Sequence, residues 1–209
     1  MAEKVDLKKS LLGYQAKHEE FALLELPERS YLMIEGYGDP NTSPAYAQAL
    51  QALYPVAYKL KFFSKRELGR DYVVMPLEGL WWAKDVTSFT ERRDKSLWHW
   101  TMMIMMPDWI ERSMFESIKE DLGRKDPPID LAKVRFEIFA EGLCVQTLHV
   151  GPYDDEAQTL RRMHQEFIPE RGLELTGRHH EIYLNDPRRV APENLRTILR
   201  QPVRSTSGN

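Results

Sequence analysis

Two stretches of this chain carry the same features in the same order, and this repetition limits the possible folds more than any other property of the sequence. In each stretch a strand-like segment runs into a glycine turn, a helix with one apolar face follows, and two strand-like segments come next. A shift of about 114 positions places Pro55 of the first helix on Pro169 of the second and brings the turn GYGDP close to VGPYDD. Two strand-helix-strand-strand copies predict an α+β domain with antiparallel sheets.

The repeats also set the expected boundaries. The expected segments are an N-terminal extension at 1–28, a first repeat at about 29–106, a linker helix at 107–125, a second repeat at about 134–204 and a tail at 205–209. The two repeats and their linker therefore form one domain at 29–204.

Proline and glycine mark the limits of the expected helices. Ser43 and Pro44 suit the start of a helix, and apolar residues spaced by three and four follow them. Pro55 lies inside this helix and should kink or split it, because proline lacks the N–H that the helical ladder needs. A second amphipathic helix is expected at 108–122, with Gly123 as its stop.

Turn residues predict how the later strands are connected. Residues 134–139 and 143–150 are expected to form a hairpin around the sequence Ala-Glu-Gly. The stretch 174–184 is expected to be a single strand, followed by a short helix from Pro192 and a last strand at 197–203.

The composition excludes several classes of function. The formal net charge is −3 at pH 7, and no basic stretch is long enough to follow a phosphate backbone, which argues against nucleic-acid binding. No apolar run approaches the ~20 residues of a membrane span, and the charged N-terminus does not fit a signal peptide. Cys144 is the one cysteine, so no intramolecular disulfide can form. We therefore expect a cytoplasmic protein that acts without a membrane or a nucleic acid.

Glu181 is the most informative single residue. It lies in the segment HHEIYL at 179–184, where alternation places Ile182 on one face of a strand and His179, Glu181 and Tyr183 on the other. If that face contacts water, Glu181 is an ordinary surface charge. If the face lines a cavity, Glu181 is a candidate catalytic or ligand-binding group.

Aromatic residues are unusually concentrated, since all five tryptophans lie between positions 81 and 109. Large rings offer contact area with few rotatable bonds and can stack on a flat ligand. The rings that strand alternation selects for such a role are Tyr31 and Tyr37, Trp82, and Trp98 and Trp100 or their neighbours in the segment LWHWTMMIMM. The alternative is that each of these rings belongs to the protein core.

No metal or cofactor site is expected. His179 and His180 are adjacent, so strand alternation sends their side chains to opposite faces, and no set of His, Cys, Asp and Glu completes a coordination sphere. Glycine-rich phosphate loops and nucleophile-elbow motifs do not occur. Cys144 lies among alternating apolar residues and is expected to be a packed thiol.

Four blocks of the sequence resemble a known family. The blocks YLMIEGYGDPN, LEGLWW, FAEGLCVQTLHVGPYDDE and GRHHEIYLNDPRRVAPENLRTILRQPV closely resemble the GyrI-like small-molecule-binding family, and the resemblance runs from about Asp6 to Arg204. It implies that helices pack on one side of the strands, that a ligand cleft lies on the other side, and that ligands are bulky, aromatic and often cationic. A subgroup without a DNA-binding domain, which this chain resembles, is similar to hydrolases that open the cyclopropane ring of DNA-alkylating antibiotics.

The resemblance implies roles for individual residues. It places Glu181 on the floor of the cleft as a general base or counter-charge, with a tyrosine hydroxyl stabilising the charge that forms on the substrate carbonyl. We predict Tyr72 for that hydroxyl, with Tyr37 and Tyr183 as competitors. The predicted ligand-binding residues are Tyr37, Trp82, Trp98, Trp100, His179 and Tyr183.

Two other functions remain open at this point. A non-catalytic module could bind, sequester or sense drugs. More remotely, the chain could inhibit another protein, as the founding members of the family act on a topoisomerase. In the leading prediction the partner is a small molecule, no cofactor is needed, and no sequence feature predicts an oligomeric state.

Overall fold

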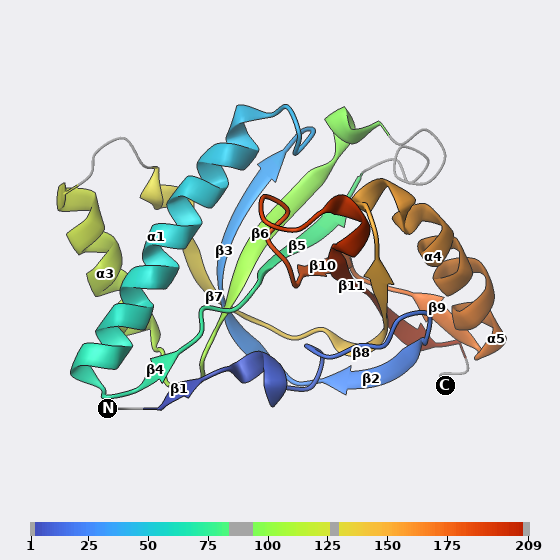
Figure 1. The fold of residues 1–209 in the computed structure, drawn as a ribbon, viewed down its shortest axis with the longest axis horizontal. Coiled ribbons are helices and arrows are strands. Elements are labelled where there is room, and N and C mark those ends of the chain that lie inside the picture. The colour runs from blue at the N-terminus through green and yellow to red at the C-terminus, as the bar shows by residue number, and fades with distance from the viewer. Residues whose placement is uncertain (1–2, 84–93, 126–129, 207–209) are drawn as a thin grey trace. The chain divides into compact units, whose positions relative to one another are not determined.

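The computed structural model describes residues 3–83, 94–125 and 130–206, and it has the α+β fold with antiparallel strand pairing that the repeated pattern predicts (Figure 1). Residues 207–209 of the expected tail lie outside the described residues. The chain divides into two compact units, each of which is discontinuous in sequence. Unit 1 contains residues 1–10, 29–75 and 82–139, and unit 2 contains residues 11–28, 76–81 and 140–209.

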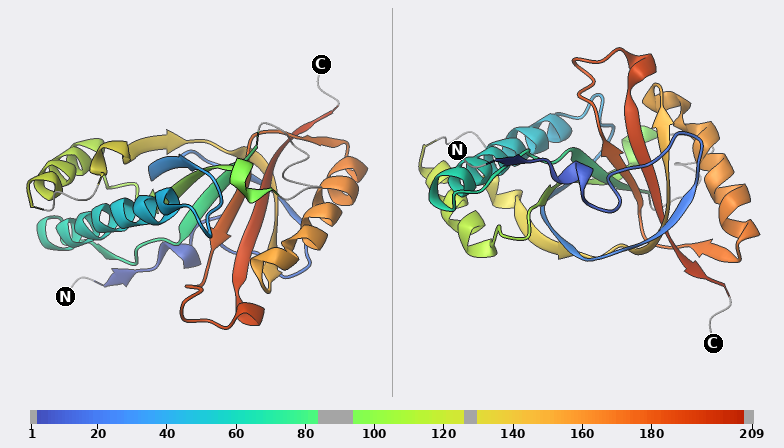
Figure 2. Two further views of the ribbon diagram at one scale, coloured as in Figure 1. Left: turned by 90° about the horizontal axis from the view of Figure 1, so that it is seen from above. Right: turned by 60° about the horizontal axis from the view of Figure 1, so that its bottom comes forward.

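The sheet of unit 1 has β3 (Arg29–Tyr37) at its centre, between β6 (His99–Met106) and β7 (Arg135–Phe139). Both neighbours run antiparallel to β3. Helices α1 (Pro44–Glu67) and α3 (Arg112–Lys125) contact one another, and α1 also packs on β3 and β6 (Figures 1 and 2). Unit 1 is therefore a small sheet covered by helices.

Shorter elements complete unit 1. The strands β1 (Lys4–Val5) and β4 (Asp71–Tyr72) form a separate parallel pair. Single 3₁₀ turns lie at Leu7–Lys9, Lys95–Leu97 and Leu131–Lys133.

Helix α1 begins where the sequence predicts, with Pro44 as its first residue after Ser43. It continues through Pro55 and is not split, because buried residues on both sides of the proline pack the helix against the rest of unit 1 and maintain the turn that lacks a hydrogen bond. The expected stop at Gly123 is wrong. Gly123 does not take the positive φ of a C-terminal stop, and α3 runs on to Lys125.

The sheet of unit 2 has the order β2 (Ala22–Leu26), β8 (Gly142–Val150), β11 (Arg196–Ser205), β10 (His179–Tyr183) and β5 (Leu77–Trp82). Each of these strands is antiparallel to its neighbours. The short strand β9 (Leu173–Leu175) pairs with the end of β11. The last residue of β5, Trp82, is counted with unit 1. β11 and the 3₁₀ turn Pro192–Asn194 before it confirm the expected short helix and final strand.

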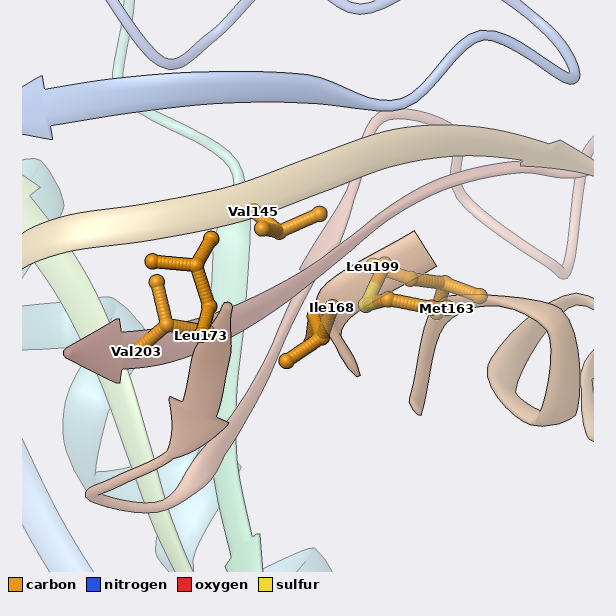
Figure 3. Close-up of a cluster of buried hydrophobic side chains, with 6 residues drawn as sticks. All are labelled: Val145, Met163, Ile168, Leu173, Leu199 and Val203. Atoms are coloured by element: carbon orange, nitrogen blue, oxygen red, sulfur yellow. The ribbon is translucent and has the colours of Figure 1, made fainter. Parts of the chain in front are cut away.

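A helical segment covers one face of this sheet. It consists of α4 (Glu156–Arg162), a π-helical turn at Met163–Phe167 and α5 (Ile168–Glu170) (Figure 2). The apolar cluster that joins the segment to the sheet is formed by Val145, Met163, Ile168, Leu173, Leu199 and Val203 (Figure 3). Leu199 of β11 therefore marks the helix-bearing face of the sheet.

Both units contain the same connection. The strand before the helix pairs antiparallel with the last strand of its repeat, which is β3 with β6 in unit 1 and β8 with β11 in unit 2. This shared pairing confirms the duplicated strand-helix-strand-strand module.

Two expectations about the later strands are wrong. β7 pairs with β3 whereas β8 pairs with β2 and β11, so residues 134–150 do not form a hairpin. Glu141, expected at the tip of that hairpin, has a side chain only 3% exposed that forms an ion pair with Arg200. The stretch 174–184 is two strands, because Gly177 adopts a φ of +59° between β9 and β10 and breaks the extended chain.

Candidate functional site

Glu181 lies in the middle of β10, opposite Gly79 of β5 and Leu199 of β11. Directly opposed residues of antiparallel strands point to the same face, and Leu199 packs under the helical segment. Glu181 therefore lies on the helix-bearing face of its sheet, with its side chain 13% exposed. The resemblance implies a cleft on the face away from the helices, and for Glu181 in unit 2 this expectation is wrong.

A chain of two hydrogen bonds, from Trp81 to Tyr183 and from Tyr183 to Glu181, ends at one oxygen of the Glu181 carboxylate. Tyr183 Oη donates to Glu181 Oε2 at 2.6 Å, and Trp81 Nε1 donates to Tyr183 Oη at 2.9 Å. An indole nitrogen can only donate, so the phenol oxygen accepts from Trp81 and gives its one proton to the carboxylate. The short distance between Tyr183 and Glu181 is typical of a charge-assisted hydrogen bond.

Gly79 leaves the space that this chain of hydrogen bonds occupies. It faces Glu181 across the two strands. A Cβ atom at position 79 would lie 2.7 Å from Trp81 Nε1 and 3.1 Å from Tyr183 Oη. A larger residue there would force the donor and the acceptor apart.

Two histidines and a second tyrosine lie near Glu181 on the same face. His179 Nε2 is 3.5 Å from Glu181 Oε1, and the ring of His179 is edge-on to His164 of the helical segment with centroids 6.3 Å apart. Burial lowers the pKa of His164 to about 4, so this ring is neutral at pH 7. Tyr153 is edge-on to Tyr183 at 5.6 Å, and burial raises the pKa of Tyr153 to about 12.

The structure thus brings together three of the predicted site residues, Glu181, His179 and Tyr183. It adds Trp81, which the sequence pattern did not indicate. Strand alternation separates Trp81 from its neighbour Trp82, but the choice between them requires the register of β5 against β10, which pairs Trp81 with His179.

The opposite face of the same sheet carries a buried ionic network that the sequence pattern did not indicate either. His180 Nε2 lies 2.9 Å from Glu78 Oε2, and His180 Nδ1 lies 2.8 Å from Glu141 Oε1. Arg200 Nη1 donates to Glu141 Oε2 at 2.5 Å. The four side chains are at most 3% exposed. When all four groups are ionised, their charges cancel.

The first residues of unit 2 complete this network. Tyr14 Oη donates to Glu78 Oε1 at 2.6 Å. Arg200 Nη2 donates to the carbonyl oxygen of Gly13 at 2.6 Å, and Arg200 Nε donates to Gln146 Oε1 at 3.1 Å. Each of the three guanidinium nitrogens therefore has an acceptor, as a buried charge requires.

Attraction between the charges outweighs burial in this network. Burial alone would lower the pKa of His180, but the charge of Glu141 and the hydrogen bonds with Glu141 and Glu78 raise it to about 9. Burial alone would raise the pKa of Glu141, but the charges of His180 and Arg200 lower it to about 2. His180 is therefore a buried imidazolium at neutral pH.

The predicted aromatic residues of unit 1 lie on two faces of its sheet. Tyr37 and His99 are opposite each other on β3 and β6 with ring centroids 4.8 Å apart, and Trp82 stacks on His99 at 5.5 Å. Tyr37 is 49% exposed, so this aromatic cluster reaches the surface. Trp100 points to the other face, where it is fully buried and edge-on to Tyr46 of α1 at 5.3 Å.

Tyr72 and Trp98 also belong to unit 1. Tyr72 is fully buried, its ring is edge-on to Trp109 at 6.0 Å, and its hydroxyl has no hydrogen-bond partner among the described residues. Burial raises the pKa of Tyr72, so the phenol keeps its proton at neutral pH. Trp98 is half-buried, with Lys95 Nζ 5.9 Å from its ring.

Among the described residues, no group of three or more His, Cys, Asp or Glu side chains could hold a metal ion. His179 and His180 point to opposite faces, as alternation predicts. Cys144 is buried, and burial raises its pKa to about 12, which confirms the packed thiol. Within the same part of the chain, no helix combines the length and the apolar character needed to cross a membrane.

Comparison with known proteins identifies the family. The family model of the GyrI-like small molecule binding domain matches residues 19–204. This chain belongs to the GyrI-like family. No protein of curated function matches this GyrI-like chain.

Crystal structures from Listeria innocua resemble this GyrI-like protein over almost its whole length. An uncharacterized conserved protein is 39% identical with a TM-score of 0.87, and the match covers 96% of this chain and 100% of that chain. A hydrolase is 39% identical with a TM-score of 0.83, again covering 96% and 100%. A further hydrolase structure is 38% identical with a TM-score of 0.85, covering 97% and 100%.

Proposed function

We propose that this GyrI-like protein binds bulky aromatic or cationic molecules and hydrolyses the cyclopropane ring of DNA-alkylating antibiotics, which detoxifies them. The observation that carries the proposal is Glu181, a largely buried carboxylate with one oxygen held by Tyr183 and with aromatic rings beside it. The likeness to two hydrolase structures from Listeria innocua supports catalysis over passive binding.

In the proposed reaction Glu181 accepts a proton from a water molecule as the water oxygen attacks a cyclopropane carbon. The strained carbon–carbon bond breaks, and its electron pair moves into the conjugated carbonyl group of the substrate. The resulting oxyanion is stabilised by a tyrosine hydroxyl and then takes up a proton from solvent, while Glu181 releases to solvent the proton that it accepted. The product is the substrate plus one molecule of water.

Tyr72 is the proposed hydrogen-bond donor to the oxyanion. Its phenol is protonated at neutral pH, and its hydroxyl has no partner among the described residues. Tyr183 is less suited, since it already donates its proton to Glu181. Tyr37 and Trp82 are proposed to stack on the ligand through their surface cluster.

The remaining predicted ligand residues have different positions. Trp98 and His179 are proposed to contact the ligand directly. Trp100 is packed in the core of unit 1, so we propose that it supports the residues that contact the ligand and does not contact the ligand itself.

Mass spectrometry of a spirocyclopropane compound incubated with the pure protein tests the proposal. The expected product is heavier than the substrate by one water. Glu181→Gln should abolish its formation, whereas Glu193→Gln, a matched change at an exposed residue of unit 2, should not.

Tryptophan fluorescence separates the alternative function from the leading one. Quenching by a cationic aromatic dye without any ring-opened product would indicate a non-catalytic module that binds or sequesters drugs. Product formed equally fast by Glu181→Gln would remove the carboxylate from the mechanism.

A further inference from the structure

The two oxygens of the Glu181 carboxylate have different surroundings. Oε2 accepts the hydrogen bond from Tyr183, whereas Oε1 lies 3.5 Å from His179 Nε2, a distance beyond a good hydrogen bond. We propose that Trp81 and Tyr183 are positioning residues that hold Oε2, so that Oε1 is the oxygen that acts on the bound water. This inference rests on the proposed function of Glu181 as a base.

Trp81 fixes the direction in which the hydrogen bonds run, from Trp81 to Tyr183 to Glu181. A phenol hydroxyl can donate in several directions, but the indole N–H at 2.9 Å must have an acceptor, and Tyr183 Oη provides it. The phenol proton is then directed to Glu181 Oε2 at 2.6 Å. Tyr183 consequently orients the carboxylate and does not donate to the substrate.

The pairing of β5 with β10 keeps Trp81, Tyr183 and Glu181 in place, and contacts on both faces of the sheet support this pairing. Trp81 is on β5 and its two partners are on β10, and these strands are directly paired. On the opposite face, His180 of β10 contacts Glu78 of β5 at 2.9 Å, which ties the same two strands together. Gly79 between them leaves the space in which the hydrogen bonds form.

Loss of the Tyr183 hydroxyl should let the carboxylate rotate away from its working position. A misplacement of about 1 Å can reduce a catalysed rate about a hundredfold. Tyr183→Phe should therefore lower kcat about ten- to a hundredfold and change KM less than about threefold. Gly79→Ala should have the same effect, because its Cβ displaces the same hydrogen bonds.

A spectroscopic test needs no turnover. The indole N–H signal of Trp81, assigned with Trp81→Phe, should shift in ¹H–¹⁵N spectra as acid protonates Glu181, because the hydrogen bonds connect the two groups. This response should be lost in Tyr183→Phe and in Glu181→Gln. It should remain in Tyr58→Phe, which alters a half-exposed tyrosine of α1. An unchanged response in Tyr183→Phe would overturn the inference.

The two measurements separate the inference from the proposed function. If the wild-type protein forms no product while the Trp81 signal responds to acid, the proposed hydrolysis fails and the hydrogen-bond chain stands. If the wild type forms product and Tyr183→Phe does so at the same rate, hydrolysis stands and the positioning role fails.

Discussion

The protein should become less stable as the pH rises from 6.5 to 9, and His180 should be the cause. The ionic network raises the pKa of His180 to about 9 in the folded protein, whereas an unfolded histidine titrates near 6.5. Below pH 6.5 both states carry the proton, and the stabilisation is fully present. Between the two values the folded state binds one more proton than the unfolded state, so a rising pH favours unfolding.

The expected loss is large. Each pH unit in this interval lowers the free energy of unfolding by about 1.4 kcal/mol, which gives a loss on the order of 3 kcal/mol by pH 9. No reduction for solvent screening applies, because the side chain of His180 is 0% exposed. Typical domains are stable by about 5–15 kcal/mol, so this one proton accounts for a substantial share.

Urea unfolding at pH 6.5 and 8.5, followed by tryptophan fluorescence, measures the effect. The upper pH stays below 9 because of Cys144. Burial raises the pKa of this thiol to about 12, so above pH 9 an unfolded cysteine loses its proton while the folded one keeps it, which adds a separate loss of stability. His149→Gln is the matched control, since His149 is a buried histidine bonded to the Pro152 carbonyl outside the network. The control should lose stability as the wild type does, and His180→Gln should show no loss. A wild type equally stable at both pH values, or a His180→Gln variant that still loses stability, would refute the reasoning.

Three further changes test other parts of the structure. Glu141→Gln should lower the free energy of unfolding at pH 7 by about 3–5 kcal/mol in a urea titration, because it breaks a buried ion pair. Gly36→Ala should lower the melting temperature by about 4 °C or more, because a Cβ there would lie 2.0 Å from a buried indole ring, whereas Gly123→Ala has open space and should keep or raise it. Tyr37→Ala should weaken binding of a cationic aromatic dye about two- to tenfold in a fluorescence titration, and Tyr58→Ala should not.

The order of helices and strands could be predicted because its signals are local. Periodicity and turn residues identified α1 and β3 and the repeat that relates the two units. The choice of strand partners is not local. Residues 134–150 have the pattern of a hairpin, yet their two strands pair with β3 in one case and with β2 and β11 in the other.

The candidate site shows the same limit. Glu181 could be found because regular alternation places this carboxylate on the same strand face as His179 and Tyr183. Trp81 could not be preferred to Trp82, because adjacent residues point to opposite faces and only the register decides which one meets Tyr183. The buried ionic network could not be predicted from the sequence for another reason. Glu78 and Arg200 are residue types that normally contact water, and their partners come from distant segments of the chain.

The segment before the first repeat has a consequence for the shortest chain that can fold. Residues 11–28 precede the duplicated pattern, yet they belong to unit 2, where the Gly13 carbonyl accepts from Arg200 and Tyr14 donates to Glu78. A protein trimmed to start at residue 29 would leave both groups without these partners, at a cost of about 1–3 kcal/mol for each buried polar group. We therefore expect the shortest chain that folds to begin before the first repeat, because buried charged groups need these polar partners.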